Sequence, residues 1–422
     1  MKNGKRITDA TLSRRAVLKS GAALIGSTAL GFSPWAWSAD SSGPIKIGHL
    51  TPLTGFLGAL GGYAVKGIQL QAEQINAAGG VLGRKIEVIS EDSVNPQVAS
   101  TKAQRLIERD KAVVLLGEIS SASALAISQV AARNKILFLN TGARSDSLRG
   151  KDCNRYTFHA DIPVTVLANA AGLALDRAGL IKGKKLYGLT ADYLFGHDLA
   201  KAVEKFVGSH GGKMIGNALV ATDVTDFSPY LLKIRQANPD VIACNLAGNQ
   251  VTNFIKQYAE FGLKIPLAGF NLNIADAWAA GPGNLSGIWP TVWQYKLKTP
   301  GSAAFVKAFE AKYHTQPENH AWVEYVSLKI LAQAMTATKS TDTDKLIAYL
   351  ESEAKFDILK AREAYFRSWD HQLMQEAYTY TVMPPDQAKG PHDFLVLGDA
   401  VPGANQPLEI LAPPRSESLC HM

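Results

Sequence analysis

The sequence predicts an α/β protein made of two successive units, each built around a parallel β-sheet with helices on both faces. Short apolar runs alternate with longer amphipathic runs from Pro44 onward, and the same alternation starts again after about residue 160. Parallel strands must be joined by a crossover, which is usually a helix that covers the sheet. A strand–helix pattern that occurs twice therefore predicts two lobes of related fold.

The first unit can be followed element by element. Apolar residues recur at helical spacing from Val65 to Ile75, and the pair Gly79-Gly80 ends this helix. Asn95 followed by Pro96 is typical of a helix start, because asparagine caps free amides and proline fits the first helical position. The predicted strands are 46–50, 85–90, 112–117 and 135–140, and further helices cover 95–109 and begin near Ser121.

The second unit repeats this pattern and is followed by a tail. Its predicted helices lie near 197–210, 228–237 and 250–261. The segment from Pro384 onward is rich in proline and glycine and is predicted to be loop, with residues 413–422 disordered. The predicted strands of this unit are 185–190, 213–220, 240–246 and 265–270, and Trp289, Trp293 and Trp322 are expected to be packing residues.

The first 39 residues have the pattern of an export signal. Arg14-Arg15 follows the basic residues Lys2, Lys5 and Arg6 and precedes a small-residue apolar run from Gly21 to Gly31. This order is typical of a twin-arginine signal peptide, although Val17 stands where an aromatic residue is usual. The apolar run is shorter than the roughly 20 residues that span a bilayer. We therefore expect cleavage after Ser38 or Ala39 and a periplasmic location.

Charge argues against a nucleic-acid partner once this leader is set aside. Of the 44 Lys and Arg residues six lie in 1–39, and of the 37 Asp and Glu residues one does, so 38 basic and 36 acidic residues remain. No basic cluster is left to bind phosphates. The three cysteines have no metal-ligand spacing, and we predict neither metal nor cofactor. One pair among Cys153, Cys244 and Cys420 could close, with Cys244 favoured as a buried free thiol.

Motifs of enzymes are missing from the sequence. Gly55, Gly58, Gly61 and Gly62 follow the first strand, but their spacing is not the dinucleotide-binding fingerprint. These glycines are expected to lie in a loop that allows close backbone approach. The sequence also has no nucleophile elbow of the hydrolase type. A binding protein is therefore favoured over an enzyme.

Ligands of open parallel sheets bind beyond the carboxyl ends of the strands, which selects six loops here. Two of them carry suitable chemistry. The run from Gly117 to Ser123 places hydroxyls and free amides at a helix start, which suits a carboxylate, and the run from Asn140 to Arg144 adds amide, hydroxyl and guanidinium donors. Ordinary helix capping is the alternative interpretation of both runs. The six loops are 51–62, 117–123, 140–144, 191–197, 246–250 and 271–276.

Motifs spread along the chain resemble the type I periplasmic solute-binding proteins of ABC transporters, in the branched-chain amino-acid and amide group. The most recognisable is the run from Glu73 to Lys85, which reads EQINAAGGVLGRK. The others are Ile47 to Gly55, Asp92-Ser93 with Asn95-Pro96, Thr225 to Pro229, and Asn238-Pro239-Asp240. The similarity covers nearly all of residues 44–385.

This resemblance implies two Rossmann-like lobes, joined by a three-strand hinge, that close on a small solute without catalysis. Lobe 1 would comprise 44–160 and 294–376, lobe 2 would comprise 161–293 and 377–405, and residues 406–422 would be a tail. The implied partners are a small-molecule solute and a membrane permease, with no nucleic acid, and the implied state is a monomer. A ligand-sensing subunit of a membrane receptor remains an alternative function.

The resemblance also implies a binding site, which we expect at Ser120, Ser121, Asn140, Thr141, Gly142, Arg144, Tyr193, Phe195 and Asn271. Amino-acid binders of this family commonly place an acid where this chain has Asn271, and a small hydroxyl residue where it has Arg144. These departures favour a carboxylic acid, an aromatic acid, an amide or a urea-like solute over an aliphatic amino acid, since an amide cannot balance a buried ammonium. An acid from another loop, namely Glu118, Asp192 or Asp276, would restore the amino-acid interpretation.

Overall fold

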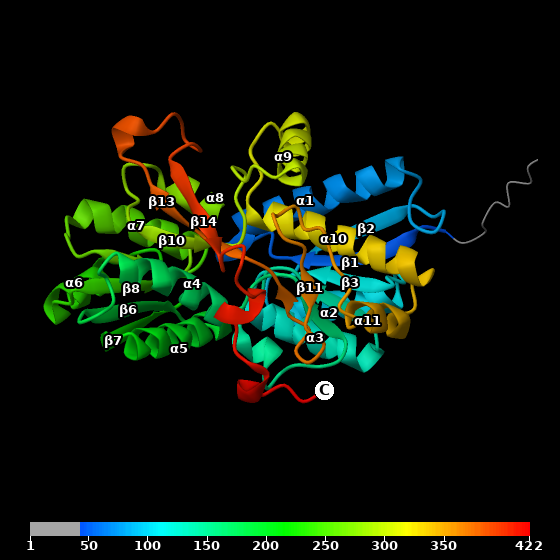
Figure 1. The fold of residues 1–422 in the computed structure, drawn as a ribbon, viewed down its shortest axis with the longest axis horizontal. Coiled ribbons are helices and arrows are strands. Elements are labelled where there is room, and N and C mark those ends of the chain that lie inside the picture. Colours follow the sequence, from blue (N-terminus) through cyan, green and yellow to red (C-terminus); the bar gives the residue numbers. More distant parts are fainter. Residues whose placement is uncertain (1–42) are drawn as a thin grey trace, which may run out of the picture. The chain divides into compact units, whose positions relative to one another are not determined.

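The computed structural model describes residues 43–422, and two large sheets organise them (Figure 1). The predicted signal peptide lies outside the described residues. We use lobe 1 for the first sheet with its helices and lobe 2 for the second sheet with its helices. The residue bounds that we expect for the lobes stay a prediction. Within residues 43–422, no helix combines the length and the apolar character that crossing a membrane requires.

Lobe 1 is built on five parallel strands in the order β2-β1-β3-β4-β5. Successive residues of a strand pack into different cores: Leu116 faces the core that holds α1 and α10, and Leu115 faces the core that holds α2 and α3. This is the period of two expected for a sheet buried on both faces. The elements are β1 Ile45–Thr51, β2 Ile86–Asp92, β3 Val114–Gly117, β4 Leu137–Asn140, β5 Thr157–His159, α1 Gly58–Ala77, α2 Pro96–Glu108 and α3 Ser121–Asn134.

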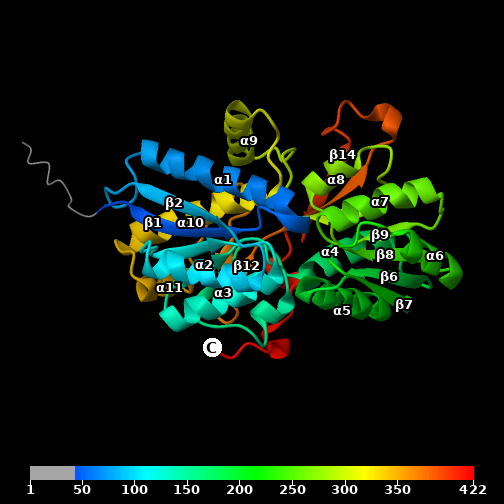
Figure 2. The ribbon, with the colours of Figure 1, turned by 180° about the vertical axis from the view of Figure 1, so that it is seen from behind.

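Lobe 2 is built on seven strands in the order β14-β13-β10-β9-β8-β6-β7. The strands from β10 to β7 are parallel, whereas β13 and β14 add an antiparallel edge. Figure 2 shows the same sheet from behind, with α7 and α5 on opposite faces. The elements are α4 Val164–Arg177, β6 Lys185–Ala191, α5 Leu194–Ser209, β7 Lys213–Val220, α6 Ser228–Ala237, β8 Val241–Asn245, α7 Asn249–Phe261, β9 Leu267–Gly269, α8 Ile274–Ala280, β10 Ile288–Thr291, β13 Ala377–Val382 and β14 Leu395–Val401.

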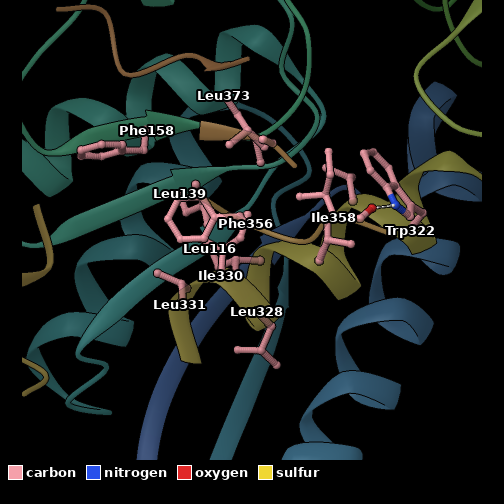
Figure 3. Packing of buried hydrophobic residues seen from close by; sticks show 14 of the residues in the cluster. Leu116, Leu139, Phe158, Trp322, Leu328, Ile330, Leu331, Phe356, Ile358 and Leu373 are labelled. Atoms are coloured by element: carbon pink, nitrogen blue, oxygen red, sulfur yellow. Dashed lines mark hydrogen bonds between the residues drawn. The ribbon is translucent and has the colours of Figure 1, made fainter. Parts of the chain in front are cut away.

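The chain returns to lobe 1 between β10 and β13. Helix α10, Asn319–Thr338, packs along α1, so two segments about 250 residues apart share one face of the first sheet. Figure 3 shows this core, where Trp322 donates a hydrogen bond of 2.9 Å to the Ile358 carbonyl among leucine side chains. The other elements here are α9 Pro300–Tyr313, α11 Thr343–Leu350, β11 Tyr365–Phe366 and β12 Leu373–Met374, with short 3-10 helices at Gly55–Leu57, Asp146–Arg149, Pro385–Gln387, Leu408–Leu411 and Arg415–Glu417.

Most predicted elements are confirmed, and the predicted caps explain their ends. The Asn95 side chain accepts a hydrogen bond of 3.0 Å from the Val98 amide at the start of α2. Trp289, Trp293 and Trp322 are fully buried, as expected for packing residues. The prediction of a loop for the glycine run after β1 is wrong, because Gly58, Gly61 and Gly62 belong to α1.

The prediction for the C-terminal tail is also wrong. Strand β14 lies within the segment expected to be loop, and Cys420 forms a disulfide with Cys153 in the segment expected to be disordered. Cys244 is free and buried, as predicted. On the way to Cys420 the tail lies against lobe 2, where the Asn169 side chain donates a hydrogen bond of 2.7 Å to the Leu411 carbonyl. The disulfide fixes the course of this tail. The sequence does not indicate which two of the three cysteines form it.

Candidate functional site

The segments that follow β3, β4, β5 and β9 meet the start of α10 in a buried polar cluster. We call it the interlobe cluster and define it as Glu118, Arg144, Asp161, Asn271, Asn273, Asp276, Glu318 and His320. All eight side chains are buried. Lobe 1 supplies Glu118, Arg144, Glu318 and His320, and lobe 2 supplies the two asparagines and Asp276. Asp161 lies in the segment between β5 and α4, where the chain crosses from one sheet to the other.

Arg144 connects the two lobes within this cluster. Its Nε donates a hydrogen bond of 2.7 Å to Asp161 Oδ2. Its Nη1 donates to the side-chain oxygens of Asn271 (3.1 Å) and Asn273 (3.3 Å) in lobe 2. Arg144 is only 6% exposed, and the carboxylate of Asp161 balances its charge inside the protein. The resemblance placed Arg144 and Asn271 in the site, and the structure brings them into direct contact.

The turn just before α3 is held by the protein's own carboxylate. Glu118 Oε1 accepts hydrogen bonds from the Ile119 amide (3.0 Å) and the Ser120 amide (2.7 Å). Ser120 caps α3, and the Ser121 hydroxyl accepts a hydrogen bond of 3.2 Å from the Ser145 amide. Glu118 has a φ of 81°, a conformation that residues other than glycine seldom adopt and that is enriched at functional sites.

The run after β4, residues 140–144, caps its own turn and lies close to two other segments of the chain. The Asn140 side chain donates to the Ala143 carbonyl (2.8 Å) and accepts from the Ala143 amide (3.0 Å), so it holds its own turn. A Cβ atom at Gly142 would lie 3.1 Å from the His320 ring and 3.2 Å from the Glu118 carbonyl oxygen. Glycine at this position therefore allows three segments to converge. For Asn140 the ordinary capping interpretation describes the structure.

In lobe 2 the predicted residues divide between the cluster and the core. The Asn271 amide donates to the Leu246 carbonyl (2.9 Å) while its oxygen accepts from Arg144. Tyr193 is half-buried, and its ring meets that of Phe56 in lobe 1 edge-to-face at 5.4 Å. Phe195, in α5, is buried in a core that also contains Leu57, Leu60 and Ile119 of lobe 1. Its contact with a solute stays a prediction.

Sequence reasoning missed the contribution of α10 to the cluster. Glu318 caps this helix through Oε1, which accepts from the amides of His320 (2.6 Å) and Ala321 (3.3 Å). Glu324, one turn further on, accepts a hydrogen bond of 2.5 Å from the Thr141 hydroxyl. An acidic residue before a long apolar helix was the available signal for Glu318. Nothing in the sequence indicated that this helix start lies beside β3 and β4.

Of the three acids named as alternatives, two lie in the cluster. Glu118 and Asp276 are buried there, whereas Asp192 is 45% exposed and pairs with His197 at 2.7 Å. The oxygens Glu118 Oε2 and Glu318 Oε2 have no hydrogen-bond partner among residues 43–422, and neither has His320 Nε2. The Ser93 hydroxyl lies beside Glu118 but outside hydrogen-bonding geometry. Buried polar atoms without partners are uncommon and ask for an explanation.

Burial dominates the electrostatics of the cluster. It raises the pKa of Glu118 to about 8 and that of Asp276 to about 7, against the lowering effect of nearby hydrogen-bond donors. Burial also raises the pKa of Glu318 well above its ordinary value. The pKa of His320 is lowered well below 6.5, first by burial and then by the charge of Arg144. Burial in the cluster therefore favours the neutral form of these four side chains unless an opposite charge lies beside them.

Comparison with known proteins identifies the fold that carries this cluster. The sequence pattern of the family named periplasmic binding protein matches residues 44–389. The chain belongs to this family. It is thus a binding protein and not an enzyme, and its two mainly parallel sheets are those of a type I periplasmic binding protein.

Relatives and solved structures agree with this family over most of the chain. A Leu/Ile/Val-binding protein homolog 8 from Brucella abortus (strain 2308) is 28% identical over 329 residues, which cover 73% of this chain and 80% of that protein. The crystal structure of a periplasmic binding protein from Burkholderia mallei is 29% identical, with a TM-score of 0.82, and the match covers 89% of this chain and 98% of that one. A branched-chain amino-acid ABC transporter periplasmic ligand-binding protein from Burkholderia xenovorans LB400 is 26% identical, with a TM-score of 0.77 and coverage of 90% and 99%.

Proposed function

We propose that this protein captures a small amino-acid-like, carboxylic or amide solute between its two lobes and delivers it to the permease of an ABC uptake transporter. The observation that carries this proposal is the Arg144 side chain of lobe 1, which binds Asn271 and Asn273 of lobe 2 within a buried polar cluster. Such convergence of a few polar groups at a domain interface is typical of small-molecule sites. The names of two relatives, which refer to Leu/Ile/Val and to branched-chain amino acids, support the amino-acid part of this class.

The test is a thermal-shift screen of the mature protein against amino acids, aromatic acids, amides and urea. A solute at 100 times its Kd stabilises the folded state by about 2.7 kcal/mol, which shifts the melting temperature visibly. Arg144→Ala is expected to weaken binding of the best solute roughly 10- to 100-fold, because a charge-assisted hydrogen bond is worth about 1.5–3 kcal/mol. The exposed Arg155→Ala serves as control. A solute that is converted during the assay would contradict a pure binding function.

Closure is the second part of this proposal. We place the lobes at 44–160 with 294–376 and at 161–293 with 377–405, hinged where the chain crosses between the two sheets. Small-angle scattering with the solute identified by the screen is expected to show a smaller radius of gyration than the solute-free protein shows. Identical curves at saturating solute would count against closure.

Export by the twin-arginine route is proposed from residues 1–39. Replacing Arg14 and Arg15 by lysine is expected to abolish accumulation in the periplasm, and unchanged accumulation would reject the route. A sensing subunit is the second candidate function. Uptake of the solute that depends on the neighbouring permease favours transport, and binding without such uptake favours sensing.

A further inference from the structure

The chain that follows β14 is attached to both lobes. We call residues 402–420 the terminal strap. One end of the strap continues from β14, the edge strand of the lobe 2 sheet, and the other end forms the disulfide between Cys420 and Cys153 of lobe 1 (Figure 1). Each lobe therefore holds one end of the strap, and a movement of one lobe against the other must also move the strap.

Lobe 1 holds the strap at two carbonyl groups in addition to the disulfide. Arg362 Nη1 donates a hydrogen bond of 2.9 Å to the Gln406 carbonyl. Arg367 Nη1 donates a hydrogen bond of 3.1 Å to the Pro413 carbonyl. Both arginines lie in the part of the chain that returns to lobe 1 between β10 and β13.

Lobe 2 holds the strap at positions that alternate with these. Asn169 in α4 donates a hydrogen bond of 2.7 Å to the Leu411 carbonyl, and the Leu411 side chain is buried. Lys205 in α5 forms an ion pair of 2.9 Å with Glu417. Along the strap the attachments thus run to lobe 1, lobe 2, lobe 1, lobe 2 and again lobe 1. A rotation of one lobe against the other would break the attachments to one of them.

The strap also passes beside a direct contact between the lobes. The amide and the hydroxyl of Ser147 in lobe 1 donate hydrogen bonds of 3.1 Å and 2.6 Å to Asp198 in α5 of lobe 2. Leu419 of the strap lines a cavity of about 380 Å³ together with Ser147 and Asp198. The strap is therefore placed where the lobes touch.

We propose that the terminal strap, fastened by its disulfide, holds the two lobes in contact, so that the oxidised protein opens less readily than the reduced protein. This inference rests on the lobe closure of the proposed function. The bond is accessible, because Cys153 and Cys420 are half-buried and each lines a surface pocket. An oxidising compartment keeps such a bond closed. A dithiol opens it by two exchanges, becomes a cyclic disulfide and leaves one thiol on each cysteine.

The disulfide is the attachment on which the others depend. Lys205 and Glu417 are 75% and 52% exposed, and an exposed ion pair contributes little by itself. A covalent link keeps such groups at a high effective concentration around their partners. Opening the bond is therefore expected to release the strap and, with it, the restraint on the lobes.

The test is hydrogen exchange of the solute-free mature protein, with the disulfide closed and after a dithiol has opened it. Residues 271–277 report on the contact between the lobes, because the Ile274 amide donates a hydrogen bond of 3.4 Å to Asn319 of lobe 1. We expect this segment to exchange at least about threefold faster once the bond is open. The strands β3 and β8 report on the interior of each lobe, and their exchange should not change.

Two variants control for the reagent. Cys153→Ser with Cys420→Ser should exchange as fast at 271–277 as the opened protein, with or without dithiol. Cys244→Ser keeps the disulfide and should respond to the dithiol as the unmodified protein does. If the serine pair does not fold, the comparison of the unmodified protein before and after reduction remains decisive.

Three outcomes would overturn the inference. Residues 271–277 could exchange equally in the closed and the opened protein while the strap exchanges faster. The strap itself could exchange at the same rate after reduction, which would show that it is held without the disulfide. The strands β3 and β8 could accelerate as much as 271–277, which would show a loss of stability of the whole fold. None of these outcomes touches solute binding, and the proposed function fails instead if the oxidised protein binds no solute of the screen.

Discussion

Arg144 and Asp161 show how one ion pair can serve both the stability of the fold and the contact between lobes. Both side chains are nearly inaccessible to water, and the 2.7 Å contact joins the loop after β4 to the crossing segment between β5 and α4. A buried pair contributes little against an apolar replacement, but loss of one partner leaves an uncompensated charge. Removing Arg144 therefore affects the folded protein even without a solute.

We expect Arg144→Ala to lower the free energy of unfolding by about 3–5 kcal/mol, measured by urea denaturation without solute. Adding Asp161→Asn should recover part of this loss, because the stranded charge disappears. The exposed pair of Arg155 and Asp344 gives the control, since Arg155→Ala should cost no more than about 1 kcal/mol. If Arg144→Ala and Arg155→Ala lower the free energy of unfolding equally, the buried Asp161 carboxylate is not destabilising when it lacks its partner.

At the scale of elements, the packing of α1 on α10 depends on a glycine. A Cβ atom at Gly67 would lie 2.0 Å from the Ala321 carbonyl oxygen, so the two helices approach through backbone contact. Gly62 lies in the same helix and has nothing within 4 Å of the corresponding position. The two glycines therefore separate the steric role of glycine from its effect on helix propensity.

We predict that Gly67→Ala destabilises the protein by at least about 1–3 kcal/mol, because overpacking forces α10 to shift. Gly62→Ala should instead stabilise it by about 0.5–1 kcal/mol, since alanine is the better helix former. Thermal melts of the two variants check the opposite signs. If both variants change the stability in the same direction, α10 accommodates the added methyl group at position 67 without loss of stability.

At the scale of the whole molecule, the disulfide joins residues 267 positions apart and ties the C-terminal tail to lobe 1. Cys244 is the third cysteine, and burial raises the pKa of its thiol to about 12. A thiol reagent is expected to label no cysteine in the native protein and one after denaturation without reductant. Labelling of three cysteines under those conditions would contradict the pairing.

The disulfide is also expected to stabilise the folded protein. The double variant Cys153→Ser with Cys420→Ser should lower the free energy of unfolding by about 2–5 kcal/mol.

The acids of the interlobe cluster also predict how pH affects closure, on the hinge proposed above. The pKa values of Glu118 and Asp276 are raised to about 8 and about 7 where the lobes meet, and would return toward 4–5 in an open form that water reaches. The stabilisation of the closed form by these acids is therefore complete below their open-form pKa values of about 4–5. It weakens as pH rises above them and is lost above about pH 8.

Small-angle scattering of the solute-free protein should accordingly show a smaller radius of gyration at pH 6.5 than at pH 9. Glu118→Gln should reduce this dependence, whereas Asp192→Asn should not. Below pH 6.5 protonation of His320 opposes closure, because burial and Arg144 lower its pKa in the cluster. A radius that is constant or falls with rising pH would contradict the argument.

The sequence by itself determined the class of fold and most of its elements. Periodicity, caps and glycine pairs are local signals, and they placed α2, α3 and the strands β1 to β4 and β6 to β9 within a few residues. The strands β5, β10, β13 and β14 were not predicted. Local signals could not place the chain's crossings, the antiparallel strand β14 or the pairing of Cys153 with Cys420. These features depend on segments hundreds of residues apart, which no local pattern relates.

The chemistry of the site divides in the same way. Residue types and the ends of strands led to Ser121, Arg144 and Asn271, and the fold brings Arg144 onto Asn271. Whether a donor is free for a solute depends on its nearest neighbours in space. Here Glu118 accepts from the Ile119 and Ser120 amides just before α3, while Asp161 accepts from Arg144 Nε. Glu318 and His320 enter the cluster because α10 packs on α1, a contact set by shape and burial across the whole core.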